Sequence, residues 1–292
     1  MAVCERKPYT LKIGGKALEL GPRTLIMGIL NITPDSFSDG GRFADHERAL
    51  AQAFELISAG ADILDVGGES TRPGSNPVPL PVELERVIPI IRAVRERSDI
   101  PISIDTNKSE VARQALAAGA DIINDVSSLR FDPDMARVAA GSGAPVILMH
   151  MLGAPRTMQI NPVYESVISE IIAFLEERMK FAVQNGIERS QIIVDPGIGF
   201  GKTVTHNLNI IRDLDSFSCM DRPILLGASR KRFIGKILGR PEGEREMGTA
   251  VVNAFGIAAG AHILRVHDVA FHREAVGLAE AVRNGCSSLR DE

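Results

Sequence analysis

The sequence predicts an α/β fold, a (β/α)₈ or TIM barrel preceded by a short N-terminal β-hairpin. Eight short apolar runs recur along the chain, and segments with helical periodicity lie between them. The runs are continuously apolar, as is typical of parallel strands that are covered on both faces. An open, doubly wound sheet is the alternative, because it also alternates strands with helices.

The predicted hairpin comes first. Two short alternating runs, residues 10–13 and 16–20, flank Gly14-Gly15, a dipeptide that favours a two-residue hairpin turn. The eight candidate strands then follow at residues 24–32, 61–67, 100–105, 120–126, 144–150, 191–197, 222–228 and 261–267.

Amphipathic segments separate these strands. Residues 46–60 place Leu50, Phe54 and Ile57 on one side of a helix that we expect to end near Gly60. Two further predicted helices, within residues 107–120 and 164–186, end in the same way at Gly119 and Gly186. A glycine after the last turn favours helix termination because it adopts a left-handed conformation without steric cost.

Composition limits the class of protein. The 292 residues are 45% hydrophobic and 24% charged, which excludes a disordered, collagen-like or disulfide-scaffold protein. The 33 basic and 37 acidic residues give a net charge of −4, which argues against a nucleic-acid partner. No linker is evident, so we expect one domain spanning residues 1–292.

The chain has neither a signal-peptide pattern nor a run of about 18 apolar residues, so we expect no membrane association. Its three cysteines, Cys4, Cys219 and Cys286, are far apart in the sequence. They are typical of free thiols in a reducing compartment, and we therefore expect a cytoplasmic protein.

The carboxyl ends of the predicted strands carry side chains that can bind a ligand, and this is the end at which barrels place their active sites. One such residue alone would be typical of a turn or a helix cap. A set on all eight strands favours a shared site: Asn31, Glu69 to Arg72, Asp105, Asn124, Asp125, Met149, His150, Asp195, Ser229 to Lys231, Arg265 and His267.

The residue types indicate the kind of ligand. Three offer acceptors and an amide for a flat, polar heterocycle with neighbouring N–H donors: Asp105, Asn124 and Asp195. Four offer donors and positive charge for a phosphate or carboxylate: Arg72, Lys231, Arg265 and His267. The site therefore favours a heterocycle joined to an anion.

Long loops surround these residues. Residues 31–43 and 67–79 are rich in turn formers and are either lids or plain connections. Residues 195–203 are glycine-rich, but they fit neither phosphate-loop nor dinucleotide spacing. We expect their glycines to let the backbone approach a flat ligand, with Phe200 as an aromatic wall or a core residue. Residues 227–238 place basic side chains at a predicted helix start, which favours an anion.

Eight motifs in order resemble the dihydropteroate synthases, the folate-pathway family that sulfonamides target, over about residues 24–268. They are MGILNITPDSFSDGG, DVGGESTRPGS, SIDT, INDVSS, LMHM, DPGIGFGK, GASRK and LRVHDV. The resemblance implies that a 7,8-dihydropterin carrying a hydroxymethyl diphosphate condenses with 4-aminobenzoate. The products would be 7,8-dihydropteroate and pyrophosphate, and Mg²⁺ would help to hold the pyrophosphate.

The resemblance also implies roles for individual residues. The pterin ring would contact Asp195, Asn124, Asp105, Lys231 and, on its face, Met149. The diphosphate would be held by Arg265, His267 and Arg72, with Asn31 binding Mg²⁺. The aminobenzoate slot would be lined by Phe37, Thr71, Pro73 and Phe200. Gly227 belongs to the substrate-binding set, and the catalytic set is Asp105, Lys231, Thr71 and Arg72.

One residue departs from the family pattern at a substrate position. Arg232 stands where many members have a serine that can contact the aminobenzoate carboxylate. We expect this carboxylate to rely here on the helix start and on the charge of Arg232. Ile198, where an aromatic residue is frequent, would be a mild packing change.

Two other functions fit a pterin-binding barrel. A methyltransferase acting on a reduced folate would transfer a methyl group to a corrinoid partner, and a non-catalytic paralogue would only bind a pterin. The resemblance also implies a homodimer formed through the late helices, where residues 248–261 are small and apolar. The alternative for this segment is a buried barrel helix.

Overall fold

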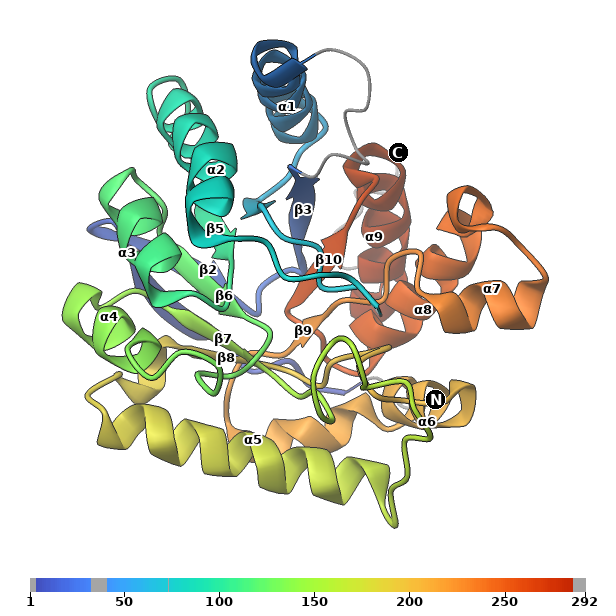
Figure 1. The fold of residues 1–292 in the computed structure, drawn as a ribbon. Coiled ribbons are helices and arrows are strands. Elements are labelled where there is room, and N and C mark those ends of the chain that lie inside the picture. The colour runs from blue at the N-terminus through green and yellow to red at the C-terminus, as the bar shows by residue number, and fades with distance from the viewer. Residues whose placement is uncertain (1–3, 33–40, 73, 286–292) are drawn as a thin grey trace.

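Eight parallel strands form a nearly closed barrel in the computed structural model, which describes residues 4–32, 41–72 and 74–285 (Figure 1). The strands pair in the order β8-β7-β6-β5-β4-β3-β10-β9, and a parallel bridge between Val194 and Ile224 joins the two ends of the sheet. Their bounds are β3 Leu25–Asn31, β4 Ile63–Gly67, β5 Ile102–Asp105, β6 Ile122–Asp125, β7 Val146–Met149, β8 Ile192–Asp195, β9 Leu225–Leu226 and β10 Ile263–Val266. This confirms the barrel and excludes the open sheet.

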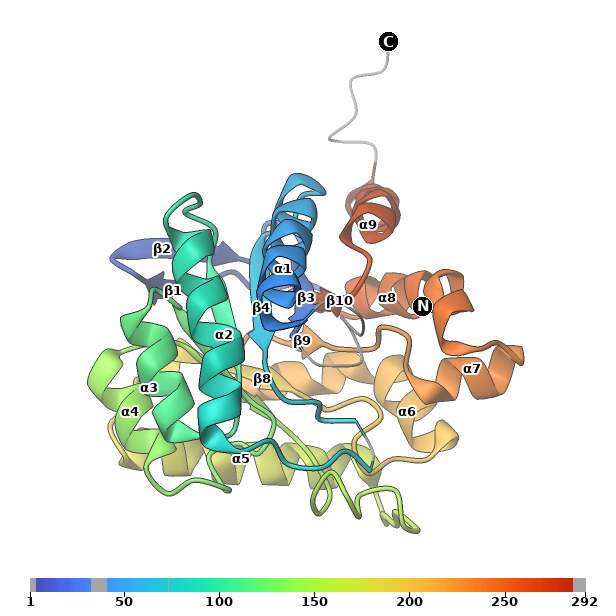
Figure 2. The same ribbon diagram turned by 45° about the horizontal axis from the view of Figure 1, so that its top comes forward.

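Helices surround the barrel on its outside (Figures 1 and 2). They are α1 Gly41–Ser58, α2 Leu80–Arg95, α3 Ser109–Ala117, α4 Met135–Ser142, α5 Val167–Gln184, α6 Val204–Arg212, α7 Arg232–Leu238, α8 Glu246–Ala258 and α9 Val269–Asn284. Short 3₁₀ helices lie between them, among them η2 Arg189–Gln191, η3 Leu214–Met220 and η4 Glu242–Glu244. Over the described residues, no helix is both long enough and apolar enough to span a bilayer.

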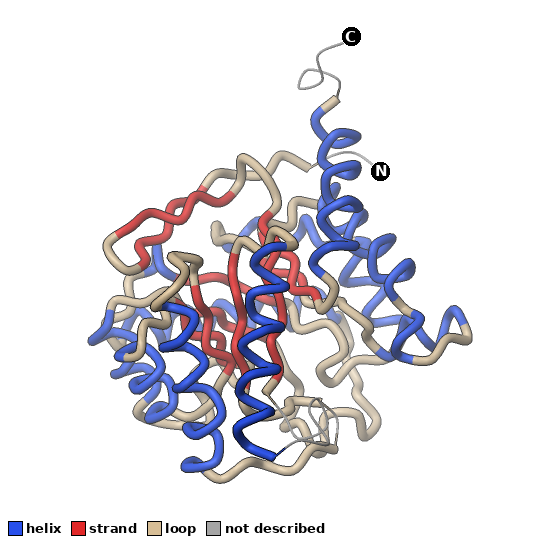
Figure 3. Tube along the Cα trace, turned by 90° about the horizontal axis from the view of Figure 1, so that it is seen from above, coloured by secondary structure: helices blue, strands red, loops and turns tan. Residues whose placement is uncertain are grey.

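The predicted hairpin is present as β1 Tyr9–Ile13 and β2 Lys16–Leu20. Gly14 and Gly15 both have positive φ, +48° and +78°, as a two-residue hairpin turn requires. Leu11 and Leu20 pack on Leu25 and other residues inside the amino ends of the strands. Figure 3 shows the hairpin at one end of the strands and the long loops at the other. The hairpin thus closes the end of the barrel opposite the predicted site.

Side-chain alternation divides the core into two layers. Inward-facing residues such as Met27, Ile63 and Ile193 fill the barrel near the hairpin. Outward-facing residues such as Ile26 and Leu64 pack against the helices. Side chains alternate along a strand, so every second residue points into the barrel. Toward the carboxyl ends of the strands, these inward-facing residues are polar rather than apolar.

The buried face of α1 differs from the predicted one. Ala49, Ala53 and Leu56 are its core residues, whereas Phe54 is half-buried beneath the Arg97 guanidinium. Small residues face the sheet because α1 approaches it closely. A Cβ on Gly28 of β3 would lie 3.5 Å from the Leu56 Cβ. The larger Leu50 and Ile57 lie at the margins of this contact.

Candidate functional site

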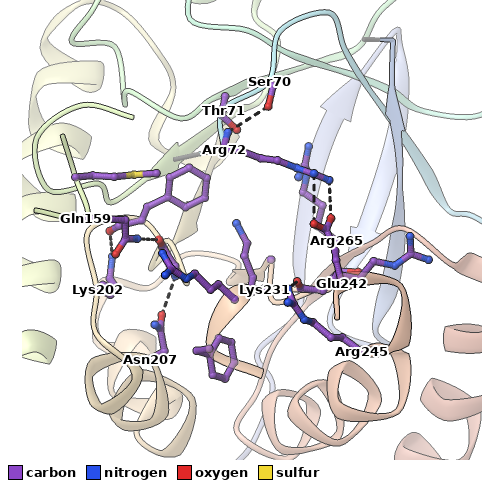
Figure 4. A pocket seen from close by; sticks show the side chains of 18 of the residues that line it. Ser70, Thr71, Arg72, Gln159, Lys202, Asn207, Lys231, Glu242, Arg245 and Arg265 are labelled. Atoms are coloured by element: carbon purple, nitrogen blue, oxygen red, sulfur yellow. Dashed lines mark hydrogen bonds and ion pairs between the residues drawn. The ribbon is translucent and has the colours of Figure 1, made fainter. Parts of the chain in front are cut away.

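A cavity of about 980 Å³ opens at the carboxyl ends of the strands (Figure 4). It brings together residues that are distant in sequence, from β3 through β10. The predicted site residues that line it are Asn31, Thr71, Arg72, Asp105, Phe200, Gly227, Lys231, Arg265 and His267. Phe37 and Pro73 lie outside the described residues.

Three other predicted residues, Asn124, Met149 and Asp195, are buried at the carboxyl ends of β6, β7 and β8. A Cβ on Gly227, which lines the cavity, would lie 3.7 Å from the Asp195 Oδ2. Met149 packs with Phe200 in a small apolar cluster. Asn124 pairs with Asp105, which lines the cavity, across β5 and β6. The three residues therefore lie next to residues that line the cavity.

Arg265 organises the acids of this region. Its Nε donates to Asp65 Oδ2 at 2.6 Å, and its NH2 group donates to Asp105 Oδ2 at 2.6 Å. Asn124 Nδ2 donates to the Asp65 carboxylate at 3.3 Å. Burial acts to lower the pKa of Arg265, but the Asp65 and Asp105 carboxylates outweigh it and raise that pKa above its ordinary value. Arg265 is therefore a fixed cation at the floor of the site.

Asp65 was missed by the sequence reasoning. It is fully buried inside β4, and it lies in the middle of an apolar run rather than at its end. The alternation of side chains along β4 was the available signal. It places Asp65 inside the barrel, where a buried acid needs a partner.

Asp105 has one carboxylate oxygen that no described residue binds. Burial raises its pKa to about 7, against the lowering effect of Arg265, and the neighbouring Asp65 raises it further. Its second oxygen, Oδ1, is buried and has no hydrogen-bond partner among the described residues. A buried acceptor left without a partner costs free energy, so this oxygen is suited to a group that a ligand brings.

Asp195 and Lys231 have shifted pKa values of opposite sense. Burial raises the pKa of Asp195 to about 6, although the Gly197 N–H donates to its Oδ1 at 2.7 Å. Burial also lowers the pKa of Lys231 to about 8, and Arg265 lowers it further. The Lys231 Nζ lies 4.1 Å from the centre of the Phe200 ring, and Figure 4 shows the lysine extending into the cavity.

Gly199, one of the glycines after β8, lines the cavity as predicted, whereas two others make close contacts elsewhere. Gly197 has φ +70°, and a Cβ there would lie 1.9 Å from the His150 carbonyl oxygen. Gly201 has φ +65°, and its Cβ would lie 2.6 Å from the Leu152 Cβ. These two glycines therefore permit close packing against residues 150–152. Phe200 meets both expectations, since it lines the cavity and packs in an apolar cluster.

His267 does not supply the predicted positive charge in this structure. Burial lowers its pKa to about 3, and Arg265 contributes next, so the imidazole is neutral near pH 7. Its Nδ1 is 2.9 Å from the Ser229 Oγ, which also accepts from the His267 backbone N–H at 3.2 Å. His267 is therefore a hydrogen-bonding group beside the cation Arg265.

The segment between β4 and α2 lies over the barrel (Figure 1). Arg72 reaches from it across the cavity mouth, where its guanidinium is 2.7 Å from Glu242 Oε1 (Figure 4). The base of the segment is anchored by Glu69, which accepts from the Val78 N–H at 3.0 Å and pairs with Lys108. Lys108 also pairs with the fully buried Glu83.

Two residues predicted at the rim do not point into the site. Both oxygens of Asp125 accept backbone N–H groups, from Ser127 and from Leu129, at 2.8 Å. Asp125 therefore stabilises the turn after β6, in which Ser128 and Leu129 have positive φ. His150 packs edge-on against the Phe174 ring, at 4.9 Å between ring centres.

Several lining residues were not among the predicted site residues: Gln159, Lys202, Glu242 and Arg245. They come from loops and helix starts that only the folded chain places beside the cavity.

Comparisons with known proteins agree with this geometry. The sequence matches the family described as pterin binding enzymes over residues 27–267. It is 49% identical to a dihydropteroate synthase of Synechocystis sp. over 276 residues, which cover 94% of this chain and 96% of the relative.

Solved structures of the same kind are similar in fold. The Yersinia pestis dihydropteroate synthase in a sulfonamide drug complex has a TM-score of 0.90 at 40% identity, covering 94% of this chain and 100% of that one. The Xanthomonas albilineans dihydropteroate synthase with 4-aminobenzoic acid has a TM-score of 0.90 at 42% identity, covering 96% and 100%. Family match, identity and coverage agree, and the chain therefore belongs to the pterin binding enzymes and, among them, to the dihydropteroate synthase family.

Proposed function

We propose that this chain condenses (7,8-dihydropterin-6-yl)methyl diphosphate with 4-aminobenzoate to give 7,8-dihydropteroate and pyrophosphate. One observation carries the proposal. The barrel places buried acceptors, Asp105 and Asp195, beside the cations Lys231 and Arg265 around one cavity. This arrangement suits a polar heterocycle joined to an anion.

The pterin would lie over the carboxyl ends of β5 to β8. Asp195 would accept two neighbouring N–H groups of the amino-pyrimidine edge, as a carboxylate accepts an arginine fork. With a pKa of about 6, Asp195 is mainly ionised at pH 7. Asn124 and Lys231 would contact other polar edges, and Met149 would pack on the ring face.

The diphosphate would bind beside Arg265 and Arg72, with the neutral His267 as a hydrogen-bonding partner. The residues present fit Mg²⁺ only if the substrate's phosphate oxygens supply further ligands. Asn31 offers an amide oxygen at the cavity wall, and the described residues contain no cluster of three His, Cys, Asp or Glu side chains that could hold a metal ion. Mg²⁺ commonly takes few protein ligands and completes its shell with phosphate oxygens and water. When bound, it would neutralise charge on the leaving group.

The reaction is a substitution at the methylene carbon. The C–O bond to the diphosphate breaks, and its electron pair leaves with pyrophosphate, whose charge Arg265 and Arg72 offset. The positive charge left behind is delocalised into the dihydropterin, where the Asp105 carboxylate stabilises it electrostatically. The arylamine nitrogen then forms the new C–N bond and releases its proton. A neutral arylamine needs no strong base, and exclusion of water protects the cation.

The aminobenzoate slot would be formed by Thr71 and Phe200, together with Phe37 and Pro73. Arg232 lines the cavity and is exposed, and its guanidinium would pair with the aminobenzoate carboxylate. Sulfonamides, which the Yersinia pestis relative binds, would compete with aminobenzoate here.

The purified protein, the dihydropterin methyl diphosphate, Mg²⁺ and labelled 4-aminobenzoate test the proposal. We expect labelled dihydropteroate and an equal amount of pyrophosphate. Methyl transfer from a reduced folate to a corrinoid would instead support the methyltransferase. Pterin binding without turnover would support a non-catalytic binding protein.

We also propose a homodimer formed through the late helices. One face of α8 is buried at Thr249 and Asn253, but Met247, Val251 and Phe255, which follow each other at four-residue spacing, are exposed. An exposed apolar face on one helix is typical of an association surface. Light scattering of Val251→Glu against wild type tests this, and an unchanged dimeric mass would contradict the assignment.

We further propose that the protein acts in the cytoplasm. Its cysteines in the described residues, Cys4 and Cys219, are free thiols, as is typical of a reducing compartment.

A further inference from the structure

Lys202 is a buried lysine that the proposed chemistry does not use. Burial lowers the pKa of its amino group to about 7, against the raising effect of Asp195. Lys202 follows β8, is 3% exposed and still reaches the cavity, where Figure 4 shows it next to Gln159. Among the described residues, no carboxylate oxygen lies within 4.0 Å of its Nζ. A buried amino group costs free energy to remove from water, so its presence here points to a role that an apolar side chain would not perform.

The hydrogen bonds of Lys202 connect two neighbouring loops. Its Nζ donates to the Phe200 carbonyl oxygen at 3.0 Å, and it lies 2.9 Å from His150 Nδ1 and 3.5 Å from the His150 carbonyl oxygen. In its charged form the lysine can only donate, so His150 Nδ1 then accepts. Burial lowers the pKa of His150 to about 2, and Lys202 lowers it further, which keeps the imidazole neutral and able to accept.

Phe200, whose carbonyl oxygen accepts from Lys202, forms part of the cavity wall. The Phe200 side chain lines the cavity, and the Lys231 Nζ lies over its ring. The same loop packs on the β7 loop at Gly197, where the glycine leaves room for the His150 carbonyl. Lys202 therefore fixes the Phe200 backbone against the segment that follows β7, directly behind the wall.

We propose that Lys202 is a positioning residue for the aminobenzoate slot. By donating to the Phe200 carbonyl, its amino group orients the Phe200 ring and leaves the pterin contacts of Asp195, Asn124 and Met149 in place. This inference rests on the proposed function, because the slot is defined by that reaction.

Lys202→Met tests the inference, with the exposed Lys180→Met on α5 as the matched control. Work near pH 8 keeps Asp195 ionised and leaves Lys202 largely uncharged, since their pKa values are about 6 and about 7. The substitution then removes hydrogen bonds rather than a charge beside Asp195. We expect the KM for 4-aminobenzoate to rise about tenfold or more. The Kd of 6-hydroxymethyl-7,8-dihydropterin should change by less than about threefold, and Lys180→Met should match wild type in both.

A double-mutant cycle separates positioning from general stability. If Lys202 acts through Phe200, Lys202→Met should raise the KM for aminobenzoate little further in a Phe200→Leu background. Additive effects, or parallel losses of pterin and aminobenzoate binding, would overturn the inference. Should Lys202→Met not fold, Lys202→Gln should show the same split with a smaller rise in KM, and an unchanged KM would also overturn it. A wild-type protein that forms no dihydropteroate would instead refute the proposed function.

Discussion

Asp105 occupies the most constrained position in the site. One oxygen is held by Arg265, and the other is buried and has no partner among the described residues. Burial raises its pKa to about 7, so the folded protein resists putting a negative charge there. A cation that develops on the substrate would repay that cost, because it stabilises the ionised carboxylate only as the reaction proceeds.

Asp105→Asn should therefore lower kcat by about 100-fold or more and change the pterin Kd much less. Single-turnover rates and pterin titrations measure the two effects. A change confined to KM would contradict the electrostatic role.

The pH dependence follows from the same carboxylate. Below its pKa of about 7, Asp105 takes up a proton and loses its charge, so kcat/KM should fall as the pH drops through this value. In Asp105→Asn the midpoint of this acidic fall in kcat/KM should shift toward the pKa of Asp195, about 6. Rates measured between about pH 5 and pH 9 compare the two profiles, and an unshifted midpoint would assign the fall to another group.

Gly197 shows how a single backbone position supports the site. An alanine there would need φ +70° and would place its Cβ 1.9 Å from the His150 carbonyl oxygen. Gly197→Ala should lower stability by more than about 2 kcal/mol and weaken pterin binding, since the Gly197 N–H also holds Asp195.

Gly277→Ala is the control for this substitution. Its Cβ would enter open space within α9, so helix propensity should stabilise the protein by roughly 0.5–1 kcal/mol. Thermal denaturation and pterin titration of both variants check the pair. Equal stability of the two would contradict the steric explanation.

At the level of elements, the segment between β4 and α2 meets the segment between α7 and α8 across the cavity mouth. The Arg72–Glu242 ion pair joins them. Because Arg72 is exposed, this pair contributes about 1 kcal/mol at most. A diphosphate carries more charge than one carboxylate, and it should therefore displace Glu242 from Arg72 when it binds.

Removal of the competing acid should strengthen anion binding. Glu242→Gln should lower the Kd of pyrophosphate by up to about fivefold at low ionic strength, and the gain should shrink in salt. Glu244→Gln is the matched control, since Glu244 pairs with Arg240 at 2.9 Å rather than with Arg72. Calorimetry measures both, and weaker pyrophosphate binding by Glu242→Gln would show that the pair supports the site instead.

In the whole molecule, the residues that stabilise the barrel and those that surround the cavity lie at opposite ends of the strands. The hairpin and the apolar interior lie at the amino ends, and the cavity lies at the carboxyl ends (Figure 3). Changes in the hairpin should therefore affect folding without changing how substrate binds.

Leu11→Ala tests this separation. The side chain is fully buried against the barrel interior, so its loss should cost about 2–5 kcal/mol of unfolding free energy. The KM values should stay unchanged at temperatures where the variant is folded. Leu208→Ala, at a half-exposed position on α6, should cost less than about 1 kcal/mol. A changed KM in Leu11→Ala would show that the two ends are coupled.

Particular residues show how far local sequence patterns reach. Asn124 and Asp195 were predictable because each lies at the carboxyl end of a buried strand, and parallel strands bring these ends to one rim. Asp125 and His150 had the same signal, yet they face other parts of the fold, since neighbouring residues on a strand point to opposite sides. Asp65 contacts Arg265 in the site but lacked this signal, because it lies inside an apolar run rather than at its end.

The amino-acid sequence determined the barrel, the hairpin and the edge that carries the chemistry, because apolar periodicity and turn residues act over a few neighbouring positions. The three-dimensional packing decided which side chains face one another: the contacts of Arg265 with Asp65 and Asp105, the reach of Arg72 to Glu242, and the burial of Lys202 behind Phe200. It also decided the charge states, since the pKa values of Asp105 and His267 depend on burial and on charges from distant strands. Such interactions join residues many positions apart, and no local pattern encodes them.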